Sequence, residues 1–341
     1  MLTCARSGIM AGRAAPRNLP GIAAALMVAI AWWAATAAHA QGYPRRTVTI
    51  VVPYSPGAAT DILARVAAQK MTDLLGQQVI VVNRDGATGA IGTEMVAHSQ
   101  PDGHTLLWGS SGPLTISPNI NLKLPYDALK DFAPVSLFSL IPYVLVVHPS
   151  VPATSLKQLV AIARAHPSKL SCASSGTGSA PHFAGELFKS MAGLDLLHVP
   201  YKGTALFMAD LVSGQIDVSF TGAASSLGYL NNGRLRGLAV TGLKRSELLP
   251  QLPTMAEAGV PGYELVVFYG LLAPAGTPST VLATLNGALL KTLERNDVHE
   301  RIAAEGAFPA GGTPEQFAAF IRSELAKYAK LVKAAGIPQS R

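Results

Sequence analysis

Short runs of β-branched and aliphatic residues alternate along the chain with longer segments in which apolar residues recur every three or four positions. Runs such as 47–52 and 78–82 suit strands that are covered on both faces in a parallel sheet. The segment from Asp61 places Leu63, Val66 and Met71 on one helical face and ends at Gly76. The pattern therefore predicts an α/β fold built from successive strand, loop and helix units.

The same alternation continues towards the C-terminus. Further strands are expected at 105–108, 143–148, 170–173, 196–199, 216–220, 238–241 and 264–272, with helices between several of them and at 278–294, 298–306 and 313–335. The apolar runs 143–148 and 264–272 are each followed by proline, which indicates two crossings between modules. We expect two lobes and a hinge: 41–142 and 266–341 form the first lobe, and 143–265 forms the second.

The first forty residues have the pattern of a cleaved signal peptide. Three arginines without acids precede an apolar run at 22–38, and Ala38-His39-Ala40 fits a signal-peptidase site. The apolar run is shorter than the ~20 residues that a membrane span needs, which favours a signal over an anchor. We expect cleavage after Ala40 and release into the periplasm.

Charge and cysteine content narrow the possible functions. The net charge of the full chain is +7, and removal of Arg6, Arg13 and Arg17 leaves +4. That value gives a mild attraction for acids and does not indicate nucleic-acid binding. Cys4 leaves with the signal, so Cys172 has no partner for an internal disulfide. The histidines lack the spacing of metal ligands, so we expect no metal. We also expect no cofactor and a monomeric protein.

Loops of small residues follow several expected strands. Pro53 ends the first strand, the small residues of 55–60 let a ligand approach the backbone, and Thr60 is placed to cap the helix near Asp61. A loop that opens a helix at the carboxyl end of a strand suits an anion, because free N–H groups and the helix dipole point at it. No Lys or Arg occurs between 47 and 62, so neutral groups would hold the anion. This arrangement suits reversible binding of an anion better than catalysis of a reaction.

Nine ordered blocks of sequence resemble the Bug-type (TctC-like) periplasmic solute receptors of tripartite tricarboxylate transporters. They include VPYSPGAATDILAR (52–65), VVNRDGATGAIGTE (81–94), SSGTGSAPHFAGELF (174–188), PTMAEAGVPGYE (253–264) and GLLAPAGTP (270–278). The resemblance implies a type II periplasmic binding protein, with two α/β lobes that each hold a central sheet flanked by helices. Two crossing strands join the lobes, which close on a ligand. The implied partners are a small organic carboxylate and the membrane permease subunits of a tripartite transporter.

The resemblance also implies where the ligand binds. It places the carboxylate at the loop 54–60, held through backbone groups and ordered water, with contacts from the second lobe. The candidate ligand-binding residues are Tyr54, Ser55, Gly57, Ala58, Ala59, Thr60, Asp61, Ser110, Ser174, Gly176, Thr177, Gly178, Ser179, His182, Tyr201 and Thr221. Two positions depart from the family: Ala58 and Ala59 replace glycines and narrow the pocket, and Thr221 replaces an acid that many members carry. Without that acid, the site should repel a second negative charge on the ligand less strongly.

Several interpretations stay open at this point. Asp61 is either a ligand contact or an acid that the helix dipole favours, and His182 is either a contact or a capping and packing residue. Ser179 and His182 could form a hydrolytic pair, but no G-x-S-x-G elbow is present, and we expect no enzyme activity. A receptor for a membrane sensor kinase is the nearest variant of a transport receptor. Di- and tricarboxylates, amino acids and aromatic acids all remain possible ligands.

Overall fold

The structure is a computed structural model that describes residues 42–120 and 123–334. The expected signal peptide and its cleavage site after Ala40 lie outside the described residues. Contacts divide the chain after Arg45, and the fold belongs to the unit that begins at Arg46. Among the described residues, no helix is long and apolar enough to cross a membrane.

Two βαβαβ units with the same strand order form the two ends of one sheet. The first consists of β1 (Val48–Val52), α2 (Ala59–Leu75), β2 (Val79–Asn83), α3 (Ala90–Ala97) and β3 (Thr105–Ser110). The second consists of β5 (Ser171–Ser174), α6 (Ala180–Ala192), β6 (Leu197–Pro200), α7 (Thr204–Val212) and β7 (Val218–Gly222). In each unit the first strand pairs in parallel with the other two. The loops after β1 and β5 therefore hold equivalent positions.

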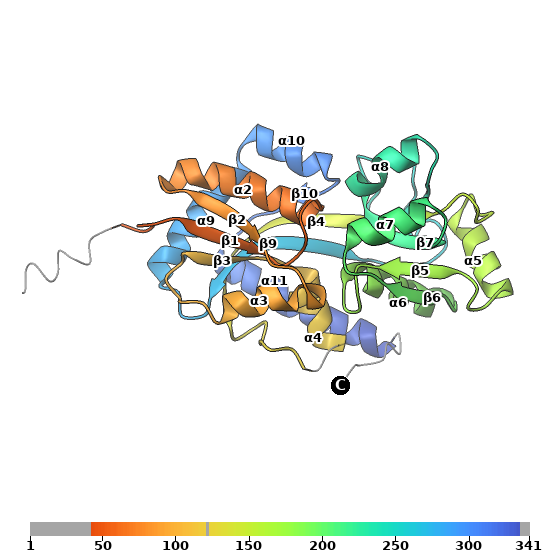
Figure 1. Ribbon diagram of the computed structural model, residues 1–341, viewed down its shortest axis with the longest axis horizontal. Helices are drawn as coiled ribbons and strands as arrows, with labels where there is room; N and C mark the ends of the chain where they lie inside the picture. The colour runs from red at the N-terminus through yellow and green to blue at the C-terminus, as the bar shows by residue number, and fades with distance from the viewer. Residues whose placement is uncertain (1–41, 121–122, 335–341) are drawn as a thin grey trace, which may run out of the picture. The chain divides into compact units, whose positions relative to one another are not determined.

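Two long antiparallel strands join these units. They are β4 (Phe132–Val147) and β9 (Val266–Pro274), and the sheet order is β2-β1-β3-β9-β4-β7-β5-β6. Figure 1 shows β1, β2 and β3 on one side of this pair and β5, β6 and β7 on the other. β9 pairs with β4 from Phe132 to Pro142, whereas β7 pairs with β4 from Tyr143 to Val147. The predicted lobe boundaries fall at this change of partner and stay a prediction.

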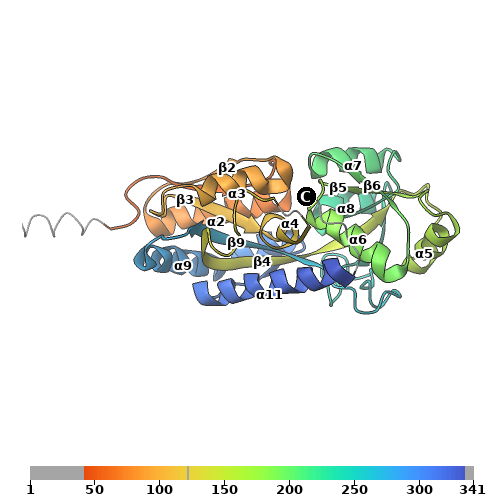
Figure 2. The same ribbon diagram turned by 90° about the horizontal axis from the view of Figure 1, so that it is seen from below.

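The remaining elements cover the sheet or extend its edges. They are η2 (Ala87–Gly89), η3 (Gly112–Ile116), α4 (Ser117–Ile120), α5 (Leu156–Ala165), α8 (Ala223–Asn231), β8 (Arg236–Val240), α9 (Ser279–Leu293), α10 (Asn296–Ala304), β10 (Phe308–Pro309) and α11 (Pro314–Ala334). β8 and β10 both pair with β4. Figure 2 shows α11 running along β4 and β9.

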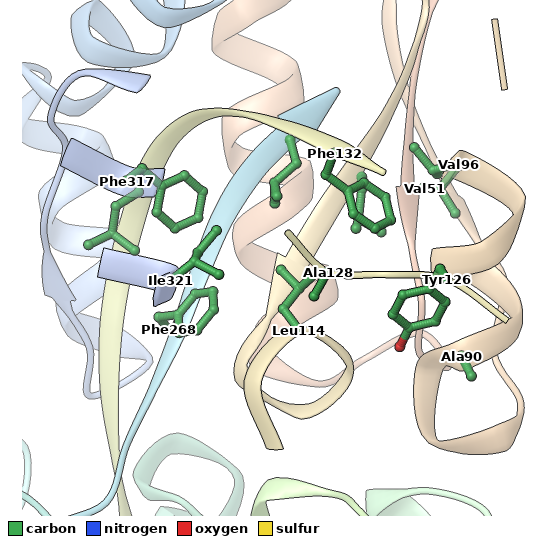
Figure 3. Packing of buried hydrophobic residues seen from close by; sticks show 13 residues of the cluster. Val51, Ala90, Val96, Leu114, Tyr126, Ala128, Phe132, Phe268, Phe317 and Ile321 are labelled. Carbon is green, nitrogen blue, oxygen red and sulfur yellow. The ribbon is translucent and has the colours of Figure 1, made fainter. Parts of the chain in front are cut away.

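An apolar cluster fills the space between the first part of the sheet and its covering helices. Phe317 and Ile321 of α11 approach Phe268 of β9, whose ring centroid lies 5.9 Å from that of Phe317 (Figure 3). A second cluster, which includes Val144 and Phe207, covers the sheet on the other side of the β9–β4 pair. These two cores fix the strand ends from which the loops of the candidate site extend.

Candidate functional site

All sixteen candidate residues lie at or after the carboxyl ends of parallel strands. Residues 54–61 follow β1, Ser110 ends β3, and Ser174 ends β5 and begins the loop 174–179. His182 lies in the first turn of α6, Tyr201 follows β6, and Thr221 lies near the end of β7. Because β3–β9, β9–β4 and β4–β7 are all antiparallel pairs, the strands of the second unit run opposite to those of the first. β9 and β7 pair with successive parts of β4, so the carboxyl ends of the two units face each other. Ligands of open α/β sheets bind at these strand ends, and the strand order therefore brings the candidates into one region.

The first turn of α2 differs from the sequence expectation. The helix begins at Ala59 and its N-cap is Ala58, so Thr60 lies inside the helix and does not cap it. No side chain in the described part of the chain caps this helix. Thr60 is 4% exposed, and its hydroxyl has no hydrogen-bond partner among the described residues. The start of α2 therefore presents unused backbone N–H groups and a buried hydroxyl that a ligand can satisfy.

Asp61 holds this loop in place. Its carboxylate accepts hydrogen bonds from the backbone N–H of Gly57 at 3.2 Å, from Nδ2 of Asn83 at 2.9 Å and from the guanidinium of Arg65 at 2.9–3.1 Å. Burial alone would raise the pKa of Asp61, but these bonds outweigh it and lower the pKa. Asn83 also donates to the carbonyl of Tyr54 at 3.0 Å. The observed geometry assigns Asp61 a positioning role for the loop.

Tyr54 turns towards β3 and η3. Ser110 donates to its hydroxyl at 3.4 Å, and a Cβ added at Gly112 would lie 2.5 Å from that hydroxyl oxygen. Burial raises the pKa of Tyr54 to about 12, so the phenol is neutral at physiological pH. Ser55, by contrast, donates to Asp85 at 2.6 Å. Tyr54 and Ser110 are thus brought together, while the hydroxyl of Ser55 is engaged elsewhere.

The loop 174–179 is stabilised by two histidines beneath it. The backbone N–H of Gly178 donates to Nδ1 of His182 at 3.2 Å, and Oγ of Ser174 lies 2.7 Å from Nε2 of His198. The two imidazoles stack with centroids 4.3 Å apart. Burial and the neighbouring His198 lower the pKa of His182 to about 3. His182 is therefore a neutral residue that accepts a hydrogen bond from the loop, and its role as a ligand contact stays a prediction.

The geometry of Ser179 does not match a hydrolytic pair. Ser179 is the N-cap of α6, and its hydroxyl donates to the carbonyl of Gly176 at 2.6 Å and accepts from the backbone N–H of His182. The Nδ1 atom of His182 is used by Gly178. Both groups thus have structural partners, and the Ser179 hydroxyl is directed at a carbonyl.

The loops from the two βαβαβ units touch. Thr88 of η2 donates to the carbonyl of Thr177 at 2.9 Å, and Ser117 donates to the carbonyl of Gly178 at 3.2 Å. A Cβ at Gly176, which has φ +119°, would lie 3.0 Å from Oγ1 of Thr88. Gly176 therefore permits a close approach that a larger residue would block.

The end of β7 resembles the start of α2. Thr221 is 2% exposed, and its hydroxyl has no hydrogen-bond partner in the described part of the chain. Gly222 is the N-cap of α8, a helix that the sequence analysis did not predict, and no described side chain caps it. Tyr201, in contrast, donates its hydroxyl to Asp210 at 2.6 Å, and burial followed by Asp210 raises its pKa to about 12.

The sequence analysis also missed two tyrosines. Tyr143 lies opposite Gly222 in the pairing of β4 with β7, and Tyr269 lies opposite Ser110 in the pairing of β3 with β9. Burial and then the neighbouring Tyr54 raise the pKa of Tyr143. A polar ring inside an otherwise aliphatic strand was the available signal. Among the described residues, no group of histidine, cysteine or acidic side chains could hold a metal ion.

Two parallel units are joined by antiparallel strands, and the loops of the candidate site lie at the strand ends. This arrangement defines an α/β periplasmic binding protein. The family model for the tripartite tricarboxylate transporter family receptor matches residues 63–337, and the chain belongs to this family. Protein BugT of Bordetella pertussis is 37% identical over 298 residues, which cover 87% of this chain and 91% of BugT. The fold class and the Bug-type family that the sequence predicted are confirmed.

Two solved structures with carboxylates in their descriptions share the fold closely. Rpa4515 of R. palustris with adipate has a TM-score of 0.84 and 37% identity, and the match covers 87% of this chain and 99% of that one. MatC from Rhodopseudomonas palustris with bound malate has a TM-score of 0.81 and 32% identity, and the match covers 85% and 100%.

Proposed function

We propose that this chain is an extracytoplasmic receptor that captures a small organic carboxylate between the starts of α2 and α8. The observation that carries the proposal is the pair of buried hydroxyls at Thr60 and Thr221, which have no partner among the described residues. Buried polar groups are normally hydrogen-bonded, so such a pair indicates a ligand that supplies the missing bonds. The adipate and malate of the related structures support a carboxylate.

Capture would rely on neutral groups. The uncapped helix starts and the two threonine hydroxyls supply hydrogen-bond donors, and Tyr54 is held neutral by burial. The bonds from Thr88 and Ser117 to the loop 174–179 would form when the predicted lobes close, and would bias the equilibrium towards the closed form. The closed form would then deliver the carboxylate to the membrane permease subunits of a tripartite transporter. We propose that no reaction is catalysed.

A thermal-shift screen of residues 41–341 against small carboxylates tests this proposal. A ligand present at a hundred times its Kd stabilises the folded state by about 2.7 kcal/mol. We expect a selective shift for one class of carboxylate, with the acid recovered unchanged. Consumption of an ester or amide that is abolished by Ser179→Ala would instead establish the hydrolase. A silent panel, repeated on protein that has been unfolded and refolded to remove bound ligand, would contradict carboxylate capture.

A further inference from the structure

Glu305 is a buried acid that nothing in the site described above uses. It follows α10 directly and is 9% exposed. Its carboxylate has no hydrogen bond or ion pair among residues 42–120 and 123–334. Burial raises the pKa of Glu305, and Arg301 opposes this only in part. The Glu305 oxygens are not among the fully enclosed polar atoms of the described residues, so this largely buried carboxylate stays open to a partner from outside the protein.

The turn that holds Glu305 packs against the start of α8. A Cβ added at Gly306, which has φ +70°, would lie 2.9 Å from the Cβ of Ala223, the first residue of α8. Further along, Phe308 and Pro309 pair with Leu140 and Ser139 of β4. In Figure 1, α10 lies along the upper edge between α2 and α8. Glu305 is thus placed between β4 and the helix whose start follows Thr221.

Tyr269 connects this acid to the candidate site. It lies opposite Ser110 of β3 and Ser139 of β4, and opposed residues in antiparallel strands point to the same face of the sheet. The Ser139 hydroxyl is fully buried and has no partner in the described part of the chain. Burial raises the pKa of Tyr269, and the neighbouring Tyr143, Tyr54 and Glu305 raise it further. Ser139 in turn lies opposite Pro309, so Tyr269, Ser139 and the segment that follows Glu305 lie on neighbouring strands.

The hydroxyls of Tyr143 and Tyr269 are two further polar groups that a ligand could use together with Glu305. Neither forms a hydrogen bond to any described residue, although Tyr269 is 5% exposed. A neutral phenol both donates and accepts, and an ionised carboxylate only accepts. Together with Glu305, these groups offer acceptors to a ligand and bring a negative charge. A second carboxylate on the ligand would be repelled by this negative charge, whereas a hydroxyl or an ammonium would donate a hydrogen bond to the Glu305 carboxylate.

We propose that Glu305, Tyr143 and Tyr269 form a second subsite, which binds the end of the ligand opposite its carboxylate and selects a proton-donating group there. The proposal rests on the proposed function, because that function supplies the carboxylate end. It names the ligand class as a carboxylate with a hydroxyl or ammonium at the other end. It also revises the expectation from Thr221: the absence of an acid at that position does not leave the site neutral.

The test is calorimetric titration of wild-type protein and Glu305→Gln with dicarboxylates and their analogues of equal length. Adipate, its ω-hydroxy analogue and its ω-amino analogue form one set, and the corresponding compounds derived from succinate form another. We expect wild-type protein to bind one of the analogues about tenfold or more tightly than the dicarboxylate, and Glu305→Gln to abolish that preference. Glu300→Gln, at an exposed position of α10, is the matched control and should keep it.

Tyr269→Phe provides a second variant that removes only the phenol hydroxyl. It should weaken binding of the preferred analogue and leave the Kd of the plain monocarboxylate unchanged. A wild-type preference for dicarboxylates, or a preference that survives Glu305→Gln in folded protein, would overturn the subsite and leave carboxylate capture standing. If wild-type protein bound no compound in either set, while another carboxylate bound and was lost on Thr60→Val, the subsite alone would fail. No binding of any carboxylate would overturn both proposals.

Discussion

The backbone N–H of Gly178 donates a hydrogen bond to Nδ1 of His182, 3.2 Å away, and the carbonyl of the same glycine accepts one from Ser117. One residue of the loop 174–179 is therefore bonded both to α6 and to α4, which follows the first βαβαβ unit. Because Nδ1 must be unprotonated to accept, this connection depends on a neutral imidazole.

The stability of the protein should fall in mild acid because of His182. Burial, His198 and Lys189 lower the pKa of His182 from 6.5 to about 3. Between these pH values the imidazole is protonated in the unfolded chain and neutral in the folded protein. The free energy of unfolding should decrease as the pH falls from 6.5 towards 3, and be regained above 6.5. His198, whose pKa is also lowered by burial, adds to the same slope.

His182→Asn tests this contribution, because an amide oxygen can accept from Gly178 without titrating. Denaturant unfolding between pH 3 and 6.5 should show a shallower slope in this variant than in wild-type protein. Replacement of the exposed His166 by asparagine should leave the slope as it is. An unchanged slope in His182→Asn would show that this imidazole is not held neutral.

The contact between Thr88 and Thr177 should support ligand binding. Thr88→Ala removes a hydrogen bond of 2.9 Å between the two units, and such a bond contributes about 1 kcal/mol. We expect a Kd about fivefold higher, with little change in the denaturation midpoint, whereas Thr88→Ser should bind like wild-type protein. Equal affinities for all three proteins would mean that this bond does not form in the bound state.

Crowding around Tyr54 should make Gly112 intolerant of a side chain. A Cβ there would lie 2.5 Å from the phenol oxygen but 3.8 Å from the ring carbon that carries it. Gly112→Ala should therefore destabilise the protein by about 1–3 kcal/mol, as overpacking does. Adding Tyr54→Phe should recover much of this loss in denaturant unfolding. Gly287→Ala in α9, where nothing lies within 4 Å of the added carbon, serves as the control.

Loss of the Asp61 charge should disturb the loop after β1. Asp61→Asn weakens the bonds to Arg65 and Gly57, and we expect a loss of about 1–3 kcal/mol in stability together with weaker ligand binding. Since the pKa of Asp61 is lowered from 3.8, its stabilisation is present above that pH and is lost as the pH falls below it. Asp73→Asn, exposed on the same helix, should have neither effect.

The sequence was informative where residues act through local pattern. The helix expected at 313–335 begins with a capping box, in which Thr313 and Gln316 form bonds of 3.2 and 2.8 Å. At the start of α5 only half of such a box forms: Ser155 accepts a hydrogen bond from the backbone N–H of Gln158, whose side chain accepts one from the backbone of Thr154. The extension of β4 back to Phe132 was missed, since Pro134 and Pro142 argue against a strand. The structure accommodates Pro134 beside a shift in register.

The parts of the site that the sequence could not predict depend on pairing between distant segments. Tyr143 and Tyr269 are marked locally only as polar rings in aliphatic strands, and nothing local marks Glu305. Their arrangement arises from the registers of β4, β9 and β10. Thr60 was expected to cap a helix, and its free hydroxyl became visible only once the helix start was placed at Ala59. The role of Asp61, in α2, likewise depended on Asn83, which ends β2.

Calorimetric titration of a bound carboxylate into wild-type protein, Thr60→Val and Thr221→Val tests the central claim most directly. Valine keeps the shape of threonine and removes only the unpartnered hydroxyl, and a hydrogen bond to a charged group contributes about 1.5–3 kcal/mol. The account predicts that each variant stays folded and binds at least about tenfold more weakly, while Thr284→Val on the exposed face of α9 binds normally. Wild-type affinity in both Thr60→Val and Thr221→Val would contradict the account.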